Sequence, residues 1–107
     1  MFGPLFESLA TLGVRTLAQA CEARVFHLRT QNGDHEVDLV VEGQRGALVG
    51  IEVKLSGAID DRDVRHLHWF KDQMKGKVTD LAVLSSGRHA YRRSDGIAVI
   101  PLALLGL

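Results

Sequence analysis

Two segments of alternating polarity, joined by a short turn, constrain this chain more than any other feature of its sequence. In residues 36–42 (EVDLVVE), Val37, Leu39 and Val41 alternate with positions that include Glu36, Asp38 and Glu42. In residues 48–55 (LVGIEVKL), apolar residues likewise alternate with Gly50, Glu52 and Lys54. Such alternation is typical of β-strands with one buried and one solvated face. The turn, Gly43-Gln44-Arg45-Gly46, has a glycine at each end, where the chain can reverse with positive φ. We therefore predict a β-hairpin.

The register of this hairpin decides which charged residues meet. With residue 42 opposite residue 48, Asp38 lies opposite Glu52, and Glu36 lies opposite Lys54. Two carboxylates so placed repel each other, whereas a divalent cation between them turns the repulsion into shared coordination. A slip by one residue would turn one apolar set away from the core, so we expect this register unless a bulge intervenes.

The remaining sequence predicts an α-β-β-β-α-β-β order in a single domain over residues 1–107. An Asn-Gly step at 32–33 predicts another hairpin turn, between the expected strands at 24–30 and 35–42. We expect an α/β (α+β) fold with a mixed central sheet flanked by helices. The expected helices span about 4–21 and 60–75, and the expected strands about 24–30, 35–42, 48–55, 78–84 and 96–102.

Each predicted helix has recognisable end signals and an apolar stripe. Gly3 is the expected N-cap of the first helix, with Pro4 at its first position. Asp60, Asp61 and Asp63 suit the start of the second helix, and Gly76 suits its end. The expected buried stripes are Leu5, Leu9, Leu12, Leu17 and Ala20 on the first helix, and Val64, Leu67, Phe70 and Met74 on the second.

Composition narrows the class of protein. The 107 residues are 46% hydrophobic and 24% charged, which is ordinary for a soluble globular domain. We expect no membrane segment and no signal peptide. One cysteine, Cys21, cannot form an internal disulfide, so we expect a buried thiol at a helix end in a cytoplasmic protein.

Net charge is zero, from 13 basic and 13 acidic residues, so any binding to nucleic acid must be local. The candidate DNA-binding residues are Arg62, Arg65, Arg92 and Arg93. The alternative for each is an ordinary solvated surface position.

The element order, with an acid on the second strand and Glu-x-Lys on the third, resembles the PD-(D/E)XK nuclease superfamily. This superfamily has a restriction-endonuclease-like α-β-β-β-α-β core, and the match covers most of the chain. The motif falls on Asp38, Glu52 and Lys54, with Val53 between the last two. Val37 stands where the signature often has proline. Resolvase-like members also carry a glutamate on the first helix, which is Glu7 here.

The resemblance implies a catalytic set of Asp38, Glu52 and Lys54. It implies that Asp38, Glu52, Glu7 and the carbonyl of Val53 hold Mg²⁺ or Mn²⁺, which would polarise the phosphate and activate a water. Lys54 would position that water and offset charge on the phosphate. The expected activity is hydrolysis of DNA phosphodiester bonds.

A closer resemblance covers the whole chain. The segments FGPLFESL, HEVDLVVE, GIEVKLS and IAVIPLALL resemble the C-terminal module, of uncharacterised function, of a family of bacterial and archaeal AAA+ ATPases. The chain has no P-loop motif, so it is not the motor itself. The implied partners are DNA, an AAA+ ATPase motor domain and a second copy in a homodimer.

Other interpretations of the same residues remain open. Asp38, Glu52 and Lys54 also suit a solvated sheet face with a cross-strand ion pair. A zinc site is disfavoured, because His66 and His68 point to different sides of a helix and His35 lacks the second histidine of H-E-x-x-H. Two function classes remain: a metal-dependent endonuclease, and a non-catalytic module that binds DNA or protein through the same fold.

Overall fold

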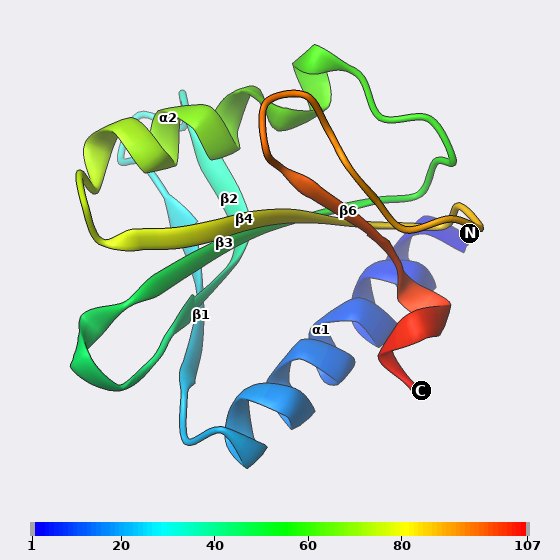
Figure 1. Cartoon of the computed structure of the whole chain (residues 1–107), viewed down its shortest axis with the longest axis horizontal. Helices are drawn as coiled ribbons and strands as arrows, with labels where there is room; N and C mark the ends of the chain where they lie inside the picture. The colour runs from blue at the N-terminus through cyan, green and yellow to red at the C-terminus, as the bar shows by residue number, and fades with distance from the viewer. Residues whose placement is uncertain (1, 107) are drawn as a thin grey trace.

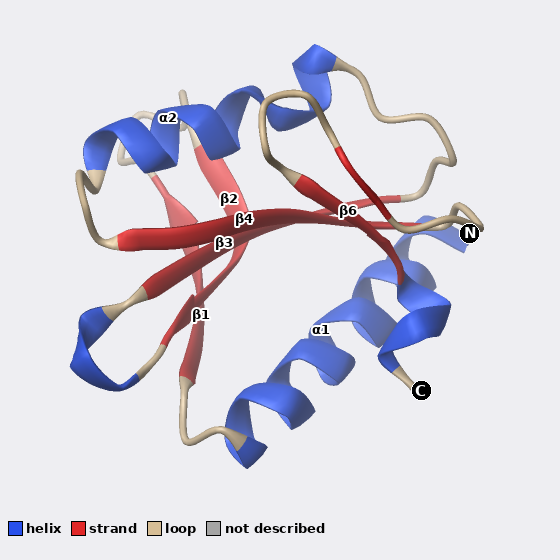
Figure 2. Ribbon diagram, viewed as in Figure 1, coloured by secondary structure: helices blue, strands red, loops and turns tan. Residues whose placement is uncertain are grey.

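A computed structural model describes residues 2–106 and confirms a mixed sheet flanked by helices (Figures 1 and 2). Its strands run in the order β1-β2-β3-β4-β6-β5 across one six-stranded sheet. The helical elements are α1 (Phe2–Ala20), α2 (Arg65–Gln73) and the short 3₁₀ turns η1 (Gln44–Gly46), η2 (Asp61–Val64) and η3 (Leu102–Leu105). The strands are β1 (Arg24–Arg29), β2 (Glu36–Glu42), β3 (Leu48–Lys54), β4 (Val78–Ser85), β5 (Tyr91–Arg92) and β6 (Ala98–Pro101).

The strand directions follow from the connections. Strands β1, β2 and β3 form an antiparallel meander with short turns. The segment that contains η2 and α2 then crosses the sheet, so β4 runs parallel to β3, and β6 runs parallel to β4. Helix α2 covers one face of the sheet, and α1 with η3 covers the other (Figure 1).

The face under α2 holds a core of large side chains. Leu67 and Phe70 of α2 are fully buried against β3 and β4. Phe70 approaches β3 at Gly50, where the missing side chain leaves room for the ring. The expected stripe on this helix is therefore confirmed for Val64, Leu67 and Phe70, while Met74 is half-buried.

Helix α1 packs on the other face through a different stripe from the expected one. Its buried residues are Ala10, Gly13, Val14 and Ala18, with Phe6 half-buried beside them. Small side chains let the helix approach the sheet closely. The expected stripe is wrong: Leu5, Leu9, Leu12 and Leu17 are 57%, 42%, 57% and 49% exposed, and Ala20 is also exposed. The apolar surface of α1 is therefore wider than the part of it that the sheet covers.

Most element boundaries lie within a few residues of the predicted ones. Helix α1 already includes Gly3, so Gly3 is not its N-cap. The second helix begins as the 3₁₀ turn η2, where Asp60 caps Asp63 and Asp63 returns the bond. The two-residue strand β5 and the turn η3 were not expected, and Cys21 is exposed rather than buried.

The turn of the central hairpin differs slightly from its prediction. Gly46 has positive φ, as expected. Gly43 is extended, however, and the other turn residue with positive φ is Arg45. In the described part of the chain, no helix is long and apolar enough to cross a membrane.

A side chain at Gly50 would test the packing of α2 on the sheet. A Cβ there would lie 2.9 Å from Phe70 Cδ2 and 3.1 Å from Leu81 Cδ2. Because two buried groups must then move, we expect Gly50→Ala to lower the free energy of unfolding by about 1–3 kcal/mol in denaturant titrations. Gly3→Ala is the control, since nothing lies within 4 Å of its added Cβ. In a helix it should stabilise slightly, and an equal loss in both variants would contradict the packing argument.

Candidate functional site

The candidate acid Asp38 lies at an irregularity of β2. Phe26 of β1 pairs with Val40 and Leu28 pairs with Val37, so His27 alone faces two residues, Asp38 and Leu39. This arrangement is a β-bulge with its extra residue on β2. Bulges are frequent beside functional sites because they re-aim a side chain and interrupt regular pairing.

The bulge changes how Asp38 meets β3. The predicted hairpin register is confirmed, because Leu39 pairs with Ile51 and Val40 pairs with Gly50. At Asp38 the side chain bonds to β3: Asp38 Oδ2 accepts a hydrogen bond of 2.8 Å from the Val53 backbone N–H. The Asp38 carbonyl lies 3.1 Å from His27 Nδ1. Asp38 is therefore held from both neighbouring strands.

Glu52 lies beside Asp38 in a largely buried position. It is on the face covered by α2, next to Val83 of β4. Its Oε1 atom is buried and has no hydrogen-bond partner within residues 2–106. Burial, and then the negative charge of Asp38, raise the pKa of Glu52 from 4.5 to about 8. A carboxylate in this position needs either a proton or a cation.

Lys54 shares this face but points to a different partner. Its Nζ atom lies 3.1 Å from Asp63 Oδ1 in η2, and the Asp63 side chain is only 14% exposed. The expected pairing of Lys54 with Glu36 is not formed, because Glu36 Oε1 instead lies 3.2 Å from His27 Nε2. The structure thus ties the end of β3 to η2.

The acid pair fits a divalent cation. The unpartnered Glu52 Oε1 supplies a buried oxygen ligand, and Asp38 supplies a second carboxylate next to it. Mg²⁺ is commonly held by only one or two protein carboxylates and keeps several waters. Val53 donates its N–H toward β2, and the carbonyl of an extended residue lies on the same side of the strand. Asp38, Glu52 and the Val53 carbonyl are therefore the residues that could hold Mg²⁺ or Mn²⁺.

Glu7 does not complete this set. It is exposed on α1, which packs on the opposite face of the sheet from Glu52. Within residues 2–106 no three His, Cys, Asp or Glu side chains come together as a metal cluster. The structure therefore brings Asp38 and Glu52 together without Glu7.

Three of the four candidate DNA-binding arginines, Arg62, Arg92 and Arg93, are paired with aspartates. Arg62 is exposed and pairs with Asp60 at 3.2 Å, and Arg65 is exposed on α2. Arg92 binds Asp80 at 3.0 Å, at the start of β4.

Arg93 is only 13% exposed and has a structural role. It binds Asp61 at 2.6 Å, the Ile59 carbonyl at 3.0 Å and Asp95 at 3.3 Å. It thereby fastens the loop after β3 to the turn before β6.

Two residues of the site carried little signal in the sequence. His27 contacts both Asp38 and Glu36, but a single histidine on a strand predicts no such role. Asp63 was expected only as part of an acidic helix start, although it also binds Lys54. The β-bulge at residue 38 brings His27 to Asp38, but a bulge leaves no clear pattern in a single sequence, so this contact could not be predicted.

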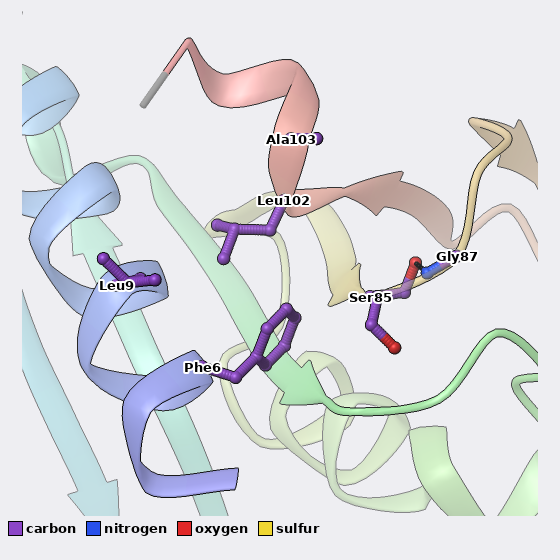
Figure 3. Close-up of a pocket in the computed structure, with 7 residues that line it drawn as sticks. Phe6, Leu9, Ser85, Gly87, Leu102 and Ala103 are labelled. Carbon is purple, nitrogen blue, oxygen red and sulfur yellow. Dashed lines mark hydrogen bonds between the residues drawn. The ribbon is translucent and has the colours of Figure 1, made fainter. Parts of the chain in front are cut away.

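A separate hollow of about 340 Å³ lies at the end of β4 (Figure 3). Phe6 and Leu9 of α1 and Leu102 of η3 form its apolar side, and Ser85 and Gly87 form its polar side. Ser85 Oγ accepts a hydrogen bond from Gly87 N at 3.2 Å, so this serine stabilises the turn that follows β4.

Comparison with known proteins gives one match. The family model described as "Domain of unknown function (DUF4143)" matches residues 2–105. No curated protein and no solved structure matches the chain.

The raised pKa of Glu52 predicts how stability depends on pH. Below pH 4.5 its carboxyl is protonated in both the folded and the unfolded chain. Between pH 4.5 and about 8 the unfolded chain loses this proton while the folded chain keeps it, so stability falls as pH rises. We expect Glu52→Gln to raise the melting temperature at pH 8 and to leave it nearly unchanged at pH 4. Glu7→Gln, an exposed control, should follow the wild-type profile, and parallel curves for Glu52→Gln and wild type would contradict the burial argument.

Proposed function

The chain belongs to the DUF4143 family of domains of unknown function, and we propose that it is a Mg²⁺- or Mn²⁺-dependent DNA endonuclease of the PD-(D/E)XK type. The observation that carries this proposal is the buried Glu52 Oε1 atom beside Asp38, which has no hydrogen-bond partner within residues 2–106. An ordinary solvated sheet face would leave Glu52 in water, with a pKa near its usual value. Burying two acids side by side costs stability, and such costs are concentrated at functional sites.

Each residue of the site has a distinct part in this proposal. Asp38 is oriented by the Val53 N–H, which donates to one of its carboxylate oxygens. Glu52 offers its buried oxygen toward the same space. A bound divalent cation would supply positive charge to a phosphate and lower the pKa of a bound water.

Lys54 is the residue that must move. In the structure it is paired with Asp63, at the edge of the site. We propose that a bound phosphate competes with Asp63 for this ammonium, since both offer anionic oxygens. Lys54 would then offset charge on the phosphate and orient the attacking water.

The neutral net charge favours the second candidate, a non-catalytic module that binds DNA or protein. Phosphate contacts from Lys and Arg dominate affinity for DNA. Arg92 and Arg93 are already engaged by aspartates, and Arg62 pairs with Asp60. Among these candidates, Arg62 and Arg65 are both exposed and lie on the η2–α2 segment, which also carries Asp63, the residue that binds Lys54.

The other proposed partners are a second copy of the chain and an AAA+ ATPase motor domain. A nuclease of this size offers little surface to a duplex, which favours a dimer. The exposed side of α1, with Leu5, Leu9 and Leu12, offers an uncovered apolar surface for a protein contact. We also propose a cytoplasmic location, because Cys21 is a free, exposed thiol.

A cleavage assay tests the enzyme proposal directly. Purified chain is incubated with supercoiled, linear, branched and single-stranded DNA in Mg²⁺ or Mn²⁺. We expect Asp38→Asn, Glu52→Gln and Lys54→Ala each to lower the cleavage rate at least about a hundredfold, because the first two weaken the hold on the cation and the third removes the ammonium that offsets charge on the phosphate. Asp72→Asn, an exposed change on α2, is the control and should cleave like wild type. Failure to cleave any substrate would favour the non-catalytic module, and equal nicking by all variants would indicate a contaminating nuclease.

Metal binding can be measured without any substrate. Because a ligand that binds only the folded chain stabilises it by mass action, Mg²⁺ or Mn²⁺ at about a hundred times its dissociation constant should add about 2.7 kcal/mol. We expect the melting temperature of the wild type at pH 8 to rise with either metal and that of Glu52→Gln to stay constant. Asp38→Asn should raise the melting temperature without metal, since it removes the repelling charge. A flat response of the wild type to both metals would contradict shared coordination.

A further inference from the structure

Three aromatic side chains gather beside the acid pair, outside the motif that the resemblance identifies. His35 precedes β2, and His66 and Trp69 are on α2. His35 Nδ1 lies 3.2 Å from His66 Nδ1, and the two rings are nearly perpendicular at 85°. The other face of His35 stacks on Trp69, with ring centroids 4.3 Å apart and planes 7° apart. No spacing or motif in the sequence predicts that His35 pairs with a residue 31 positions away.

The separation of the two nitrogens suits a shared metal ion. Zinc binds histidine nitrogen at about 2.0–2.1 Å, and two such bonds to nitrogens 3.2 Å apart would meet at an angle of about 100°, close to tetrahedral. Imidazole nitrogen is a preferred donor for Zn²⁺, Cu²⁺ and Ni²⁺, whereas Mg²⁺ prefers oxygen. These donors therefore select a different class of ion from the one that Asp38 and Glu52 select.

The tautomers of the two rings decide whether both nitrogens can face one ion. Two Nδ1 atoms 3.2 Å apart cannot both carry a proton, so in the hydrogen bond between them one ring donates and the other accepts. A neutral imidazole can instead carry its proton on Nε2. With both rings in that tautomer, the two Nδ1 lone pairs are free for a shared ion.

The surroundings also favour a cation. Stacking on Trp69 holds the His35 ring in place, so little side-chain freedom is lost on binding. Glu36 and Asp38 lie near enough for their negative charges to act on His66. Within the described residues no third His, Cys, Asp or Glu joins the pair, so two protein ligands would leave further coordination positions to water or to a small anion.

We propose that His35 and His66 form a two-histidine site for a late transition-metal ion, Zn²⁺ or Cu²⁺, with open coordination positions. The site adjoins the acid pair but does not depend on its activity. It differs from the proposed Mg²⁺ site in its donors, in its residues and in the ions that it accepts.

Trp69 is the only tryptophan of the chain, so its fluorescence is a local readout. We expect Cu²⁺ to quench it with one-to-one stoichiometry at pH 7.5, and Zn²⁺ to compete with Cu²⁺ while millimolar Mg²⁺ does not. Calorimetric titration with Zn²⁺ gives the affinity independently of Trp69, which matters because His35→Gln also alters the stacked ring. His35→Gln and His66→Gln should each weaken Zn²⁺ binding at least about tenfold.

Matched controls distinguish this site from scattered surface histidines. His68 is next to Trp69 in the sequence but binds Asp95, so His68→Gln is one control. His89 lies in an exposed loop, so His89→Gln is the other. Both should bind Zn²⁺ like wild type. Equal affinity in all four variants, or a loss confined to His68→Gln or His89→Gln, would overturn the proposal.

Two further measurements keep the outcome clear. In the wild-type chain, Zn²⁺ should shift the nitrogen resonances of His35 and His66 and leave those of His68 and His89 in place, which needs no variant that might unfold. Glu52→Gln, which removes a ligand of the proposed Mg²⁺ site, should bind Zn²⁺ within about twofold of wild type. If the nuclease proposal fails while these shifts persist, the histidine site stands, and shifts confined to other histidines would refute it.

Discussion

The register between β2 and β3 is the constraint on which the candidate site depends. It is set by packing on both faces of the sheet, with Gly50 admitting the Phe70 ring on one face and Ile51 buried on the other. A slip by one residue would turn the apolar set of one strand away from the core and put charged side chains in its place. Because this register holds up to Leu39, Asp38 lies at the end of the β2–β3 pairing, directly beside Glu52 and Val53.

At Asp38, hydrogen bonds to side chains replace the regular backbone pairing of the sheet. The bulge in β2 leaves the Asp38 carbonyl to His27 and gives the Val53 N–H to the Asp38 carboxylate. Each of these groups keeps a hydrogen bond, so the irregularity itself costs little. The cost is concentrated in Glu52, which is buried beside a like charge with one oxygen unpartnered. A structural salt bridge would have used Lys54 to relieve it, but Lys54 binds Asp63 instead.

The sequence was sufficient for the features that depend on local pattern. Alternation and turn residues predicted the hairpin, its register and the order of the main elements, because burial on two faces leaves few ways to pair such strands. The stripe of α2 was also predictable, since only one side of that helix is apolar.

Helix α1 shows where pattern alone fails. It carries leucines on one side and small residues on the adjacent side, and both sides are apolar. The distance between helix and sheet decides between them, and that distance is a tertiary property. Similarly, the contacts of His27 and the pairing of His35 with His66 follow from the bulge and from the placement of α2, which no spacing within either segment indicates.

The two donor sets found on this face of the sheet are complementary rather than redundant. Asp38 and Glu52 offer hard oxygens, and a pKa of about 8 for Glu52 means that a cation must displace a proton to bind at neutral pH. The nitrogens of His35 and His66 favour a late transition-metal ion over Mg²⁺. The positive charge of such an ion, close to Asp38, would in turn favour ionisation of the acids.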